Sequence, residues 1–384
     1  MRHIGRFLLG ALVLPATIAL SQPAVAQEVP NGDGRVRDDQ WHLRYLQVQK
    51  AHLISRGAGA VVAVPDTGVA PHPDLRRNLL AGTDMIRNGG GDGRQDQDSH
   101  GTGMAGLIAA HGRGNTGALG IAPEAKILPI RIKQSNEQGN QDDLISGIKY
   151  AVSQGADVIS ISATTDASAE LQQAIASAVH ANTVIVAGAG NQPRQRHVGF
   201  PAAYPAVIAV GGVDRAGERA SVAVTGPEID VVAPAVEIYS TSIDGKYRQG
   251  TGTSDSTAIV AGAVALLRSK YPYLPAEEIV HRLTATAIDK GPPGRDDEYG
   301  YGVIDLVAAL TTDVPPIGFE SPSASPPAGG GMTSTAVAAS RGSGDGATTR
   351  GLVTLAVIVA AGGAAYALVR RRRRADDPPP RMSR

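Results

Sequence analysis

Short apolar runs recur through the first part of this 384-residue sequence, and stretches with the periodicity of amphipathic helices separate them. The candidate strands are residues 60–64, 127–132, 157–161, 183–186, 206–210 and 229–232. Helical spacing of apolar residues covers 143–154 and 169–180. Strands that are apolar on both faces and alternate with helices predict an α/β fold in three layers, with a mostly parallel central sheet and helices on both faces.

Composition excludes several classes of protein. Lysine and arginine together number 36, as do aspartate and glutamate, so the formal net charge is zero and does not indicate a nucleic-acid partner. The chain has no cysteine, which excludes disulfides, a thiol nucleophile and a cysteine-ligated zinc ion. Asp92, Asp96 and Asp98 lie close together, but they are expected to form a solvated loop rather than a calcium site. We therefore predict neither a cofactor nor a metal ion.

The N-terminus has the parts of a secretory signal peptide. Arg2 and Arg6 come before or at the start of an apolar run, and Ala24-Val-Ala26 after it is a small-residue cleavage pattern. The sequence predicts that residues 1–26 are removed after Ala26 and that the rest of the chain is exported. An uncleaved anchor is the alternative.

A second hydrophobic segment, near the C-terminus, is long enough to cross a bilayer. Residues 351–369 contain no charged side chain, and five arginines follow directly at 370–374. Arginines after an apolar span mark the cytoplasmic side of a membrane. The sequence predicts one transmembrane helix at 351–369, a cytoplasmic tail at 370–384 and an extracytoplasmic remainder. A buried core helix is the alternative, which the arginine run disfavours.

Between these segments the composition predicts one folded domain. Residues 27–40 are polar and are expected to be mobile or wrapped on the surface. Residues 41–312 hold every candidate strand and helix and form the predicted domain. Residues 313–350 are rich in proline, glycine, serine and alanine, which is typical of a linker without a packed core.

A serine at the start of a long apolar helix is the first candidate for chemistry. Residues 250–267 begin with glycine, threonine and serine and continue as an apolar run, so Thr253 or Ser254 is expected near the helix N-cap. Backbone N–H groups of the first helical turn and the helix dipole favour negative charge there. An acyl-transfer enzyme needs such donors beside its nucleophile. Taken alone, the pattern is more typical of a capping serine.

Three more polar residues occupy positions where α/β enzymes place their chemistry, at the carboxyl ends of strands or in the loops that follow. Asp66 follows the 60–64 strand, Asn191 follows the 183–186 strand, and His100 stands between a glycine-rich loop and a helix of small residues. Each has a structural alternative, since aspartate and asparagine are common in turns and a lone histidine is more often structural than catalytic.

The four residues stand in motifs that resemble, in order and rough spacing, those of the subtilisin-like serine proteases. The motifs are Asp66-Thr-Gly68, His100-Gly-Thr-Gly103, Ala189-Gly-Asn191 and Gly252-Thr-Ser254. Residues 300–305 also resemble the closing segment of that family. The resemblance implies a subtilisin-like fold and a serine endopeptidase that cleaves a protein or peptide substrate.

The resemblance also implies a role for each residue. Ser254 attacks the peptide carbonyl, His100 takes the serine proton and later gives it to the leaving amine, and Asp66 orients the imidazole. The Asn191 side chain and the Ser254 backbone N–H form the oxyanion hole. Ser256 lies about 200° around the helix axis from Ser254 and is expected to face away from His100.

A substrate cleft is implied as well. An extended peptide pairs with the backbone of one segment, and a second segment lines the pocket for the side chain before the cut. The expected substrate-binding residues are Ser162, Ala163 and Thr164 in the first segment and Gly188, Ala189 and Gly190 in the second.

Further segments resemble the mycosins, membrane-anchored subtilases that accompany type VII secretion systems in actinobacteria. These segments are 41–46, 54–59 and 71–75, together with the predicted signal peptide and C-terminal helix. The narrower resemblance implies type VII secretion machinery as a partner and the cell membrane as the location.

The sequence departs from the family pattern beside the nucleophile. Asp255 follows Ser254 where the family has methionine or phenylalanine, and Ala258 replaces the usual proline. A carboxylate there opposes an oxyanion unless it points away or is paired. The alternative function is therefore a protease-fold subunit that stabilises a secretion complex with little turnover. An esterase is disfavoured, because no G-x-S-x-G motif surrounds Ser254 and the order is Asp, His, Ser.

Overall fold

The computed structural model describes residues 27–29, 34–87, 90–135 and 139–318. The predicted signal peptide, transmembrane helix and cytoplasmic tail lie outside these residues, as does all but the start of the predicted linker. Within the described ranges, no helix is both long and apolar enough to cross a membrane. The described part corresponds to the predicted extension and folded domain.

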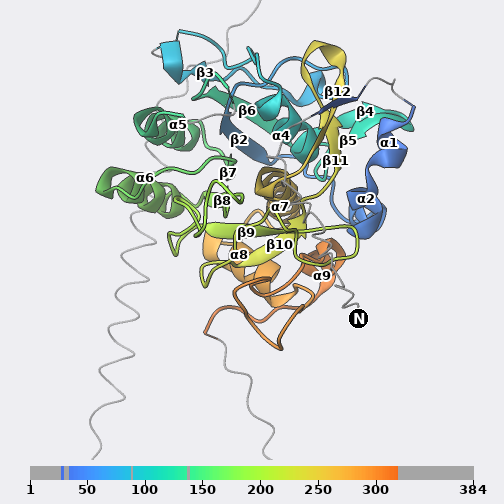
Figure 1. Cartoon of the computed structure of the whole chain (residues 1–384), viewed down its shortest axis with the longest axis vertical. Coiled ribbons are helices and arrows are strands. Elements are labelled where there is room, and N and C mark those ends of the chain that lie inside the picture. The colour runs from blue at the N-terminus through green and yellow to red at the C-terminus, as the bar shows by residue number, and fades with distance from the viewer. Residues whose placement is uncertain (1–26, 30–33, 88–89, 136–138, 319–384) are drawn as a thin grey trace, which may run out of the picture. The chain divides into compact units, whose positions relative to one another are not determined.

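A seven-stranded parallel sheet forms the centre of the domain (Figure 1). Its spatial order is β10-β9-β8-β7-β2-β6-β3, and each neighbouring pair is parallel. The strands are β2 (Val61–Asp66), β3 (Thr83–Asp84), β6 (Lys126–Arg131), β7 (Val158–Ile161), β8 (Val184–Gly188), β9 (Ile208–Val213) and β10 (Val231–Pro234). Every apolar run predicted as a strand is one of these, so the predicted α/β fold with a mostly parallel sheet is confirmed.

Helices cover both faces of this sheet. They are α4 (His100–Ala109), α5 (Gln141–Ser153), α6 (Ala169–His180), α7 (Thr253–Lys270), α8 (Ala276–Ala285) and α9 (Leu306–Thr311). α5 and α6 pack side by side on one face, whereas α4 and α7 pack together on the other (Figure 1). Side chains of Asn140, Ser168 and Asp305 accept hydrogen bonds from the first turns of α5, α6 and α9, which fixes where these helices begin.

Short antiparallel elements complete the domain, and the sequence did not predict them. β11 (Ile238–Thr241) and β12 (Tyr247–Gly250) form a hairpin that β1 (Gln27–Val29) extends to three strands, and β4 (His111–Arg113) pairs with β5 (Thr116–Leu119). Single 3₁₀ turns occur at η1 (Arg76–Asn78), η2 (Met85–Arg87) and η3 (Ile243–Gly245). None of these strands exceeds four residues, and polar residues and glycine interrupt them, so no apolar run marks them.

The N-terminal region packs on the domain through three short helices. These are α1 (Val36–Asp39), α2 (Trp41–Tyr45) and α3 (Val48–His52). In the predicted extension, Gln40 is fully buried, and its Nε2 donates to Leu119 O at 3.0 Å and Tyr239 O at 3.1 Å. The stretch 41–51, expected as one amphipathic segment, is split into α2 and α3 because Gln47 adopts a left-handed φ of 51°.

The two helices that carry the predicted histidine and serine are buried almost all round. Every residue of α4 is buried, and α7 is buried from Asp255 to Arg268. Small side chains make this close packing possible. A Cβ at Gly106 would clash with Thr241 on β11, and a Cβ at Gly262 would lie 2.6 Å from Ile121 Cβ.

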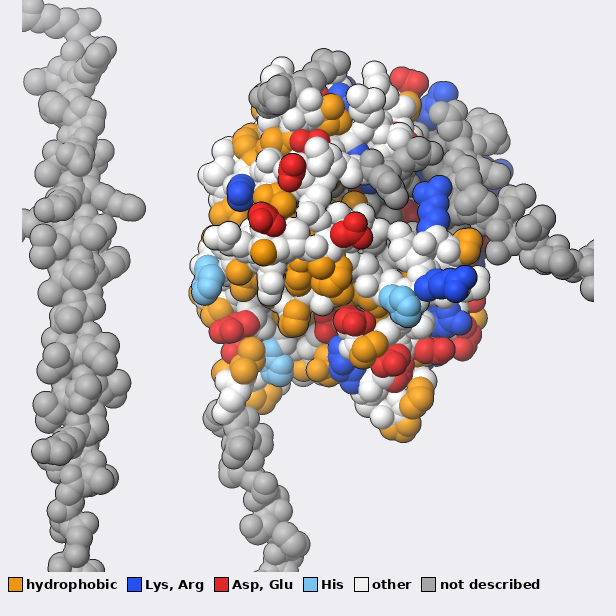
Figure 2. Space-filling view, turned by 60° about the vertical axis from the view of Figure 1, so that its left-hand side comes forward, with side chains coloured by type: hydrophobic (Ala, Val, Ile, Leu, Met, Phe, Trp, Pro, Cys, Tyr) orange, Lys and Arg blue, Asp and Glu red, His pale blue; other side chains and the backbone are white. Residues whose placement is uncertain are grey.

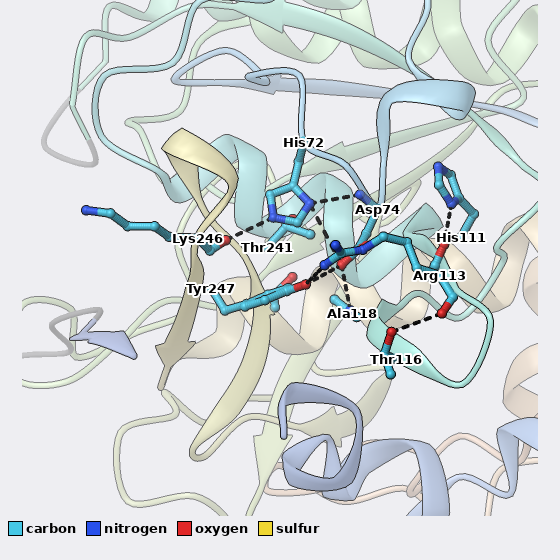
Figure 3. Close-up of polar contacts among 12 residues, drawn as sticks. His72, Asp74, His111, Arg113, Thr116, Ala118, Thr241, Lys246 and Tyr247 are labelled. Carbon is cyan, nitrogen blue, oxygen red and sulfur yellow. Dashed lines mark hydrogen bonds and ion pairs between the residues drawn. The ribbon is translucent and has the colours of Figure 1, made fainter. Parts of the chain in front are cut away.

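A buried carboxylate fixes the hairpin that leads to α7 (Figure 3). Asp74 is fully buried and accepts hydrogen bonds from Tyr247 Oη at 2.7 Å and Arg113 Nε at 2.8 Å. A third bond comes from the backbone N–H of Ala118 at 2.8 Å. Burial and the carboxylate raise the pKa of Tyr247, so its hydroxyl stays a donor. These contacts tie the 71–75 turn to both hairpins and hold the start of β12.

Charges of both signs are mixed over the surface. Figure 2 shows acidic and basic side chains interspersed with apolar ones over one face of the domain. Exposed ion pairs of the domain include Arg56 with Glu124 and Arg215 with Glu237. Neither sign dominates the face in that view, as the equal numbers of basic and acidic residues lead one to expect.

Candidate active site

Asp66 and His100 meet where β2 ends and α4 begins. His100 Nδ1 lies 2.9 Å from each carboxylate oxygen of Asp66. Asp66 is 0% exposed and His100 3%, so this contact is shielded from water. Burial alone would raise the pKa of Asp66, but interactions with His100, Lys133 and the Thr67 N–H outweigh it and lower that pKa overall. The Asp66 carboxyl is therefore ionised beside the imidazole.

A second buried aspartate shapes the loop before His100. Asp96 accepts hydrogen bonds from Thr67 Oγ1 at 2.9 Å and Thr102 Oγ1 at 2.6 Å. It also accepts from two backbone N–H groups just before the histidine, at 2.9 and 3.0 Å. The expectation of a solvated acidic loop is thus wrong for Asp96, which is 9% exposed, although Asp92 is exposed. The buried carboxylate instead links the turn after β2 to the first turn of α4.

Lys133 is a buried neighbour of Asp66 that sequence reasoning missed. It lies two residues beyond the end of β6, the strand beside β2, and is 4% exposed. Its Nζ lies 3.5 Å from Asp66 Oδ1 and 3.4 Å from the carbonyl oxygen of Ser162. A signal existed in the sequence, because a lysine just past an apolar parallel strand lies at the carboxyl edge of the sheet.

Ser254 is the second residue of α7 and is half-buried. The helix begins at Thr253 with Gly252 as its N-cap residue, which agrees with the helix start expected from the sequence. Glycine supplies no capping oxygen, so no side chain of the N-cap residue covers the first turn. The Ser254 carbonyl accepts a hydrogen bond from Ser162 Oγ at 3.2 Å, which joins the serine to the segment after β7.

The hydroxyl of the other serine at this helix start, Ser256, is hydrogen-bonded to the central sheet. Ser256 is fully buried, and its hydroxyl lies 3.1 Å from Ala233 O and 3.3 Å from Pro234 O, both on β10. Its side chain is therefore directed at β10, in keeping with the expected helical rotation away from Ser254.

Asn191 lies beside the loop that carries Ser254. Its Oδ1 accepts hydrogen bonds from the backbone N of Thr253 at 2.9 Å and from Thr253 Oγ1 at 3.3 Å. A Cβ at Gly252 would lie 3.2 Å from Asn191 Nδ2, so the amide donors stand next to the N-cap residue of α7. The half-buried asparagine is thus held by its acceptor atom, with its donor group at the start of the helix.

The predicted substrate-binding segments start at the carboxyl ends of two neighbouring strands. Residues 162–164 follow β7 and residues 188–190 end or follow β8, and these two strands are neighbours. Gln195 connects the segments, because its Nε2 donates to Thr164 Oγ1 at 2.8 Å and its Oε1 accepts from the Asn191 N–H at 2.8 Å. Sequence reasoning missed Gln195. The role of both segments in substrate binding stays a prediction.

The chain matches the model of the Subtilase family over residues 57–302. It is 37% identical to subtilisin DY of Bacillus licheniformis over 289 residues, which cover 74% of this chain and 99% of that protein. It is also 37% identical over 268 residues to a thermostable alkaline protease of Halalkalibacterium halodurans, covering 69% of this chain and 71% of that protein. The family match includes all four motif residues.

Solved structures with the same fold include several of MycP1. The crystal structure of MycP1 from Mycobacterium smegmatis has a TM-score of 0.66 and 30% identity, and covers 76% of this chain and 89% of that chain. MycP1 with its N-terminal propeptide removed has a TM-score of 0.64 and 32% identity, and covers 72% and 98%. One of the structures describes MycP1 as an essential component of the type VII (ESX-1) secretion system. The subtilisin-like fold predicted from the sequence is confirmed.

The Lys133 contact predicts how stability depends on pH. The pKa of folded Asp66 is depressed, so its ionised form stabilises the fold above the unfolded pKa of about 4, and that stability is lost as pH falls. Lys133→Met removes part of the cause. The difference in unfolding free energy between the unmutated domain and the variant should therefore be constant near neutral pH. It should narrow as pH falls through the raised pKa of Asp66 in the folded variant.

Urea denaturation between about pH 3 and 7 measures this difference. Lys149→Met, on the exposed face of α5, serves as the control and should give the same small difference at every pH. A Lys133→Met difference that does not narrow at the acid end of this range would show that Asp66 stays ionised without the lysine, so that Lys133 is not needed to depress its pKa.

Proposed function

Because the chain belongs to the subtilase family and is a serine-type endopeptidase, we propose that Asp66, His100 and Ser254 are its catalytic triad. The observation that carries the proposal is the buried hydrogen bond between His100 Nδ1 and Asp66. With Nδ1–H donating to a carboxylate, the neutral imidazole has its lone pair on Nε2 and can accept a proton there. Ser254 stands at the helix start that the family motif assigns to the nucleophile.

The reaction proposed is acyl transfer in two steps. Ser254 Oγ attacks the peptide carbonyl carbon as His100 Nε2 takes its proton, and the ionised Asp66 stabilises the imidazolium that forms. The imidazolium then gives its proton to the amine nitrogen, the C–N bond breaks, and an acyl-enzyme remains. Water attacks the ester carbonyl carbon as His100 Nε2 takes one of its protons. That proton then passes to Ser254 Oγ as the bond between the acyl carbon and Oγ breaks and the carboxylic acid leaves.

The oxyanion is stabilised by Asn191 Nδ2 and the Ser254 backbone N–H. Support comes from the hydrogen bond between Asn191 Oδ1 and the Thr253 N–H, since it fixes the amide with its donor beside the start of α7. Fixed donors cost no reorganisation when negative charge develops, and that is why they lower the barrier.

The substrate peptide is bound as an added strand along residues 162–164, with the side chain before the cut against residues 188–190. Both segments begin at the carboxyl ends of neighbouring strands, β7 and β8, and this supports the arrangement. Gln195 bonds both Thr164 and the Asn191 N–H. It therefore fixes the position of the peptide-binding segment relative to the residue that donates to the oxyanion.

The enzyme is exported and held in the cell membrane, with its domain outside and residues 370–384 in the cytoplasm, in association with type VII secretion. The signal-like residues 1–26, the apolar span 351–369 and the arginines after it support the topology. The likeness to MycP1, described as part of such a secretion system, supports the association.

Protease added to intact cells should remove the domain and spare a C-terminal tag. Loss of the tag or protection of the domain would contradict this topology.

A second function, that of a structural subunit with little turnover, is favoured by the carboxylate of Asp255 next to the nucleophile. The two functions differ in the host. If secretion persists in the Ser254→Ala strain but fails when the whole protein is deleted, the fold is needed and the chemistry is dispensable for that process.

Fluorophosphonate labelling identifies the nucleophile. Labelling and proteolysis should both be lost in Ser254→Ala, because the proposed nucleophilic hydroxyl is removed. Ser256→Ala is the matched control and should keep both, since the Ser256 hydroxyl is bound to β10 carbonyl groups. Intact mass spectrometry of each labelled domain gives the answer, and a label on Ser254→Ala would overturn the assignment.

Asn191→Ala tests the oxyanion donor. The variant should lower kcat by about 10²–10³ with little change in KM, a size taken from subtilisin itself for one such donor. Steady-state kinetics on a peptide that the unmutated domain cleaves measure both constants. An unchanged kcat would show that Asn191 is not part of the oxyanion hole. Another asparagine, Asn182, is not a suitable control position, because its side chain accepts a hydrogen bond from the Ala276 N–H.

A further inference from the structure

Asp255 is a buried acid with an unsatisfied oxygen. It follows Ser254 in the first turn of α7 and is 2% exposed. Its Oδ1 has no hydrogen-bond partner among the described residues. A lone ionised carboxylate in such a place is costly and would oppose negative charge at the neighbouring serine. A nearby positive charge is therefore required if the residue is ionised.

Arg248 of β12 supplies a positive charge at the same place. It is 5% exposed, and within the described ranges its Nε and Nη1 have no hydrogen-bond partner. A Cβ at Gly250 would lie 2.8 Å from Arg248 Nη2 and 2.8 Å from both carboxylate oxygens of Asp255. Both charged groups therefore line the space that Gly250 leaves open.

A glycine of the histidine motif makes room for the same guanidinium. A Cβ at Gly103 on α4 would lie 2.5 Å from Arg248 Nη1 and 2.8 Å from Arg248 Cδ. The Arg248 side chain thus extends from β12, the strand that leads into the Ser254 loop, to α4, the helix that begins with His100. Two glycines from separate segments admit one charged side chain beside the site.

The other charged groups around Asp255 are already engaged. His100 on α4 acts on Asp255 electrostatically, but its imidazole is bonded to Asp66, which Lys133 also contacts. From β12, the Tyr247 hydroxyl is bonded to Asp74, and from β11 comes only Tyr239. The strands β7, β8, β9 and β10, which pack on α7, contain no titratable residue. Burial raises the pKa of Asp255, while Arg248 and His100 act against that rise.

We propose that Arg248 is a positioning residue that neutralises the Asp255 carboxylate, so that an oxyanion can form on the substrate carbonyl beside Ser254. The inference rests on the proposed function of Ser254. Arg248 holds the carboxylate in the space beside Gly250 that both side chains line. Arg248 thus compensates the charge that Asp255 adds where the family pattern has an uncharged residue, and Ser254 can still act as the nucleophile.

The test compares fluorophosphonate labelling rates from about pH 5 to 9 in four variants: Arg248→Met, Arg248→Lys, Asp255→Asn and the double variant Arg248→Met/Asp255→Asn. In Arg248→Met the buried carboxyl is neutral at low pH and ionised at high pH. Its rate relative to the unmutated domain should therefore fall by at least about tenfold as pH rises. Arg248→Lys should keep most of the rate, and the double variant should lose the pH-dependent fall. Arg215→Met, an exposed arginine paired with Glu237, is the matched control.

Several results would overturn the proposal. One is an Arg248→Met rate that equals that of the unmutated domain at every pH. Another is a uniform loss that Asp255→Asn does not rescue. If Arg248→Met alone fails to fold, the double variant should fold and label. Failure of the double variant as well would contradict the pairing.

A stability measurement separates this inference from the proposed function. In the Ser254→Ala background, Arg248→Met should lower the melting temperature more as pH rises, and Asp255→Asn should cancel that effect. If the unmutated domain never labels but this coupling is present, the function fails and the charge pair stands. If the domain labels and the coupling is absent, the pair fails and the function stands.

Discussion

The buried hydrogen bond between Asp66 and His100 is the interaction on which the site depends. It joins the end of a central strand to the start of α4, so the sheet fixes the carboxylate and the helix fixes the imidazole. His100 and Lys133 keep the carboxylate ionised in a place where burial would favour its neutral form. Asp96 holds the loop between them through side-chain and backbone donors. Together these contacts fix the orientation of the imidazole.

Close packing of α4 and α7 brings the serine to that pair. Both helices are buried almost all round, and glycines such as Gly106 and Gly262 set how near they can come to their neighbours. The Asp74 contacts fix the β11–β12 hairpin, which carries Arg248 and leads to Ser254 (Figure 3). The same close approach excludes water, so charges near the serine act strongly on one another. That is why an acid at position 255 needs a counter-charge.

The parallel sheet could be predicted from the sequence because its strands are short apolar runs separated by helical periodicity. The four motif residues could be singled out because each stands at the end of a strand or the start of a helix. Lys133 was missed although its place just past an apolar strand marked it. Gln195 and Arg248 carry no such mark, since only the fold brings Gln195 to Thr164 and Arg248 to Gly103 on α4. The short antiparallel strands were missed because cross-strand pairing and the buried Asp74, rather than apolar runs, define them.

The most direct measurement of the central claim is the effect of Asp66→Asn on the labelling rate of Ser254. An asparagine keeps the shape of the side chain but cannot hold the imidazole in the tautomer that leaves Nε2 free to accept a proton. The account predicts a loss of about 10⁴-fold at neutral pH, with folding retained by circular dichroism. A variant that labels as fast as the unmutated domain would contradict the claim that the Asp66–His100 bond activates Ser254.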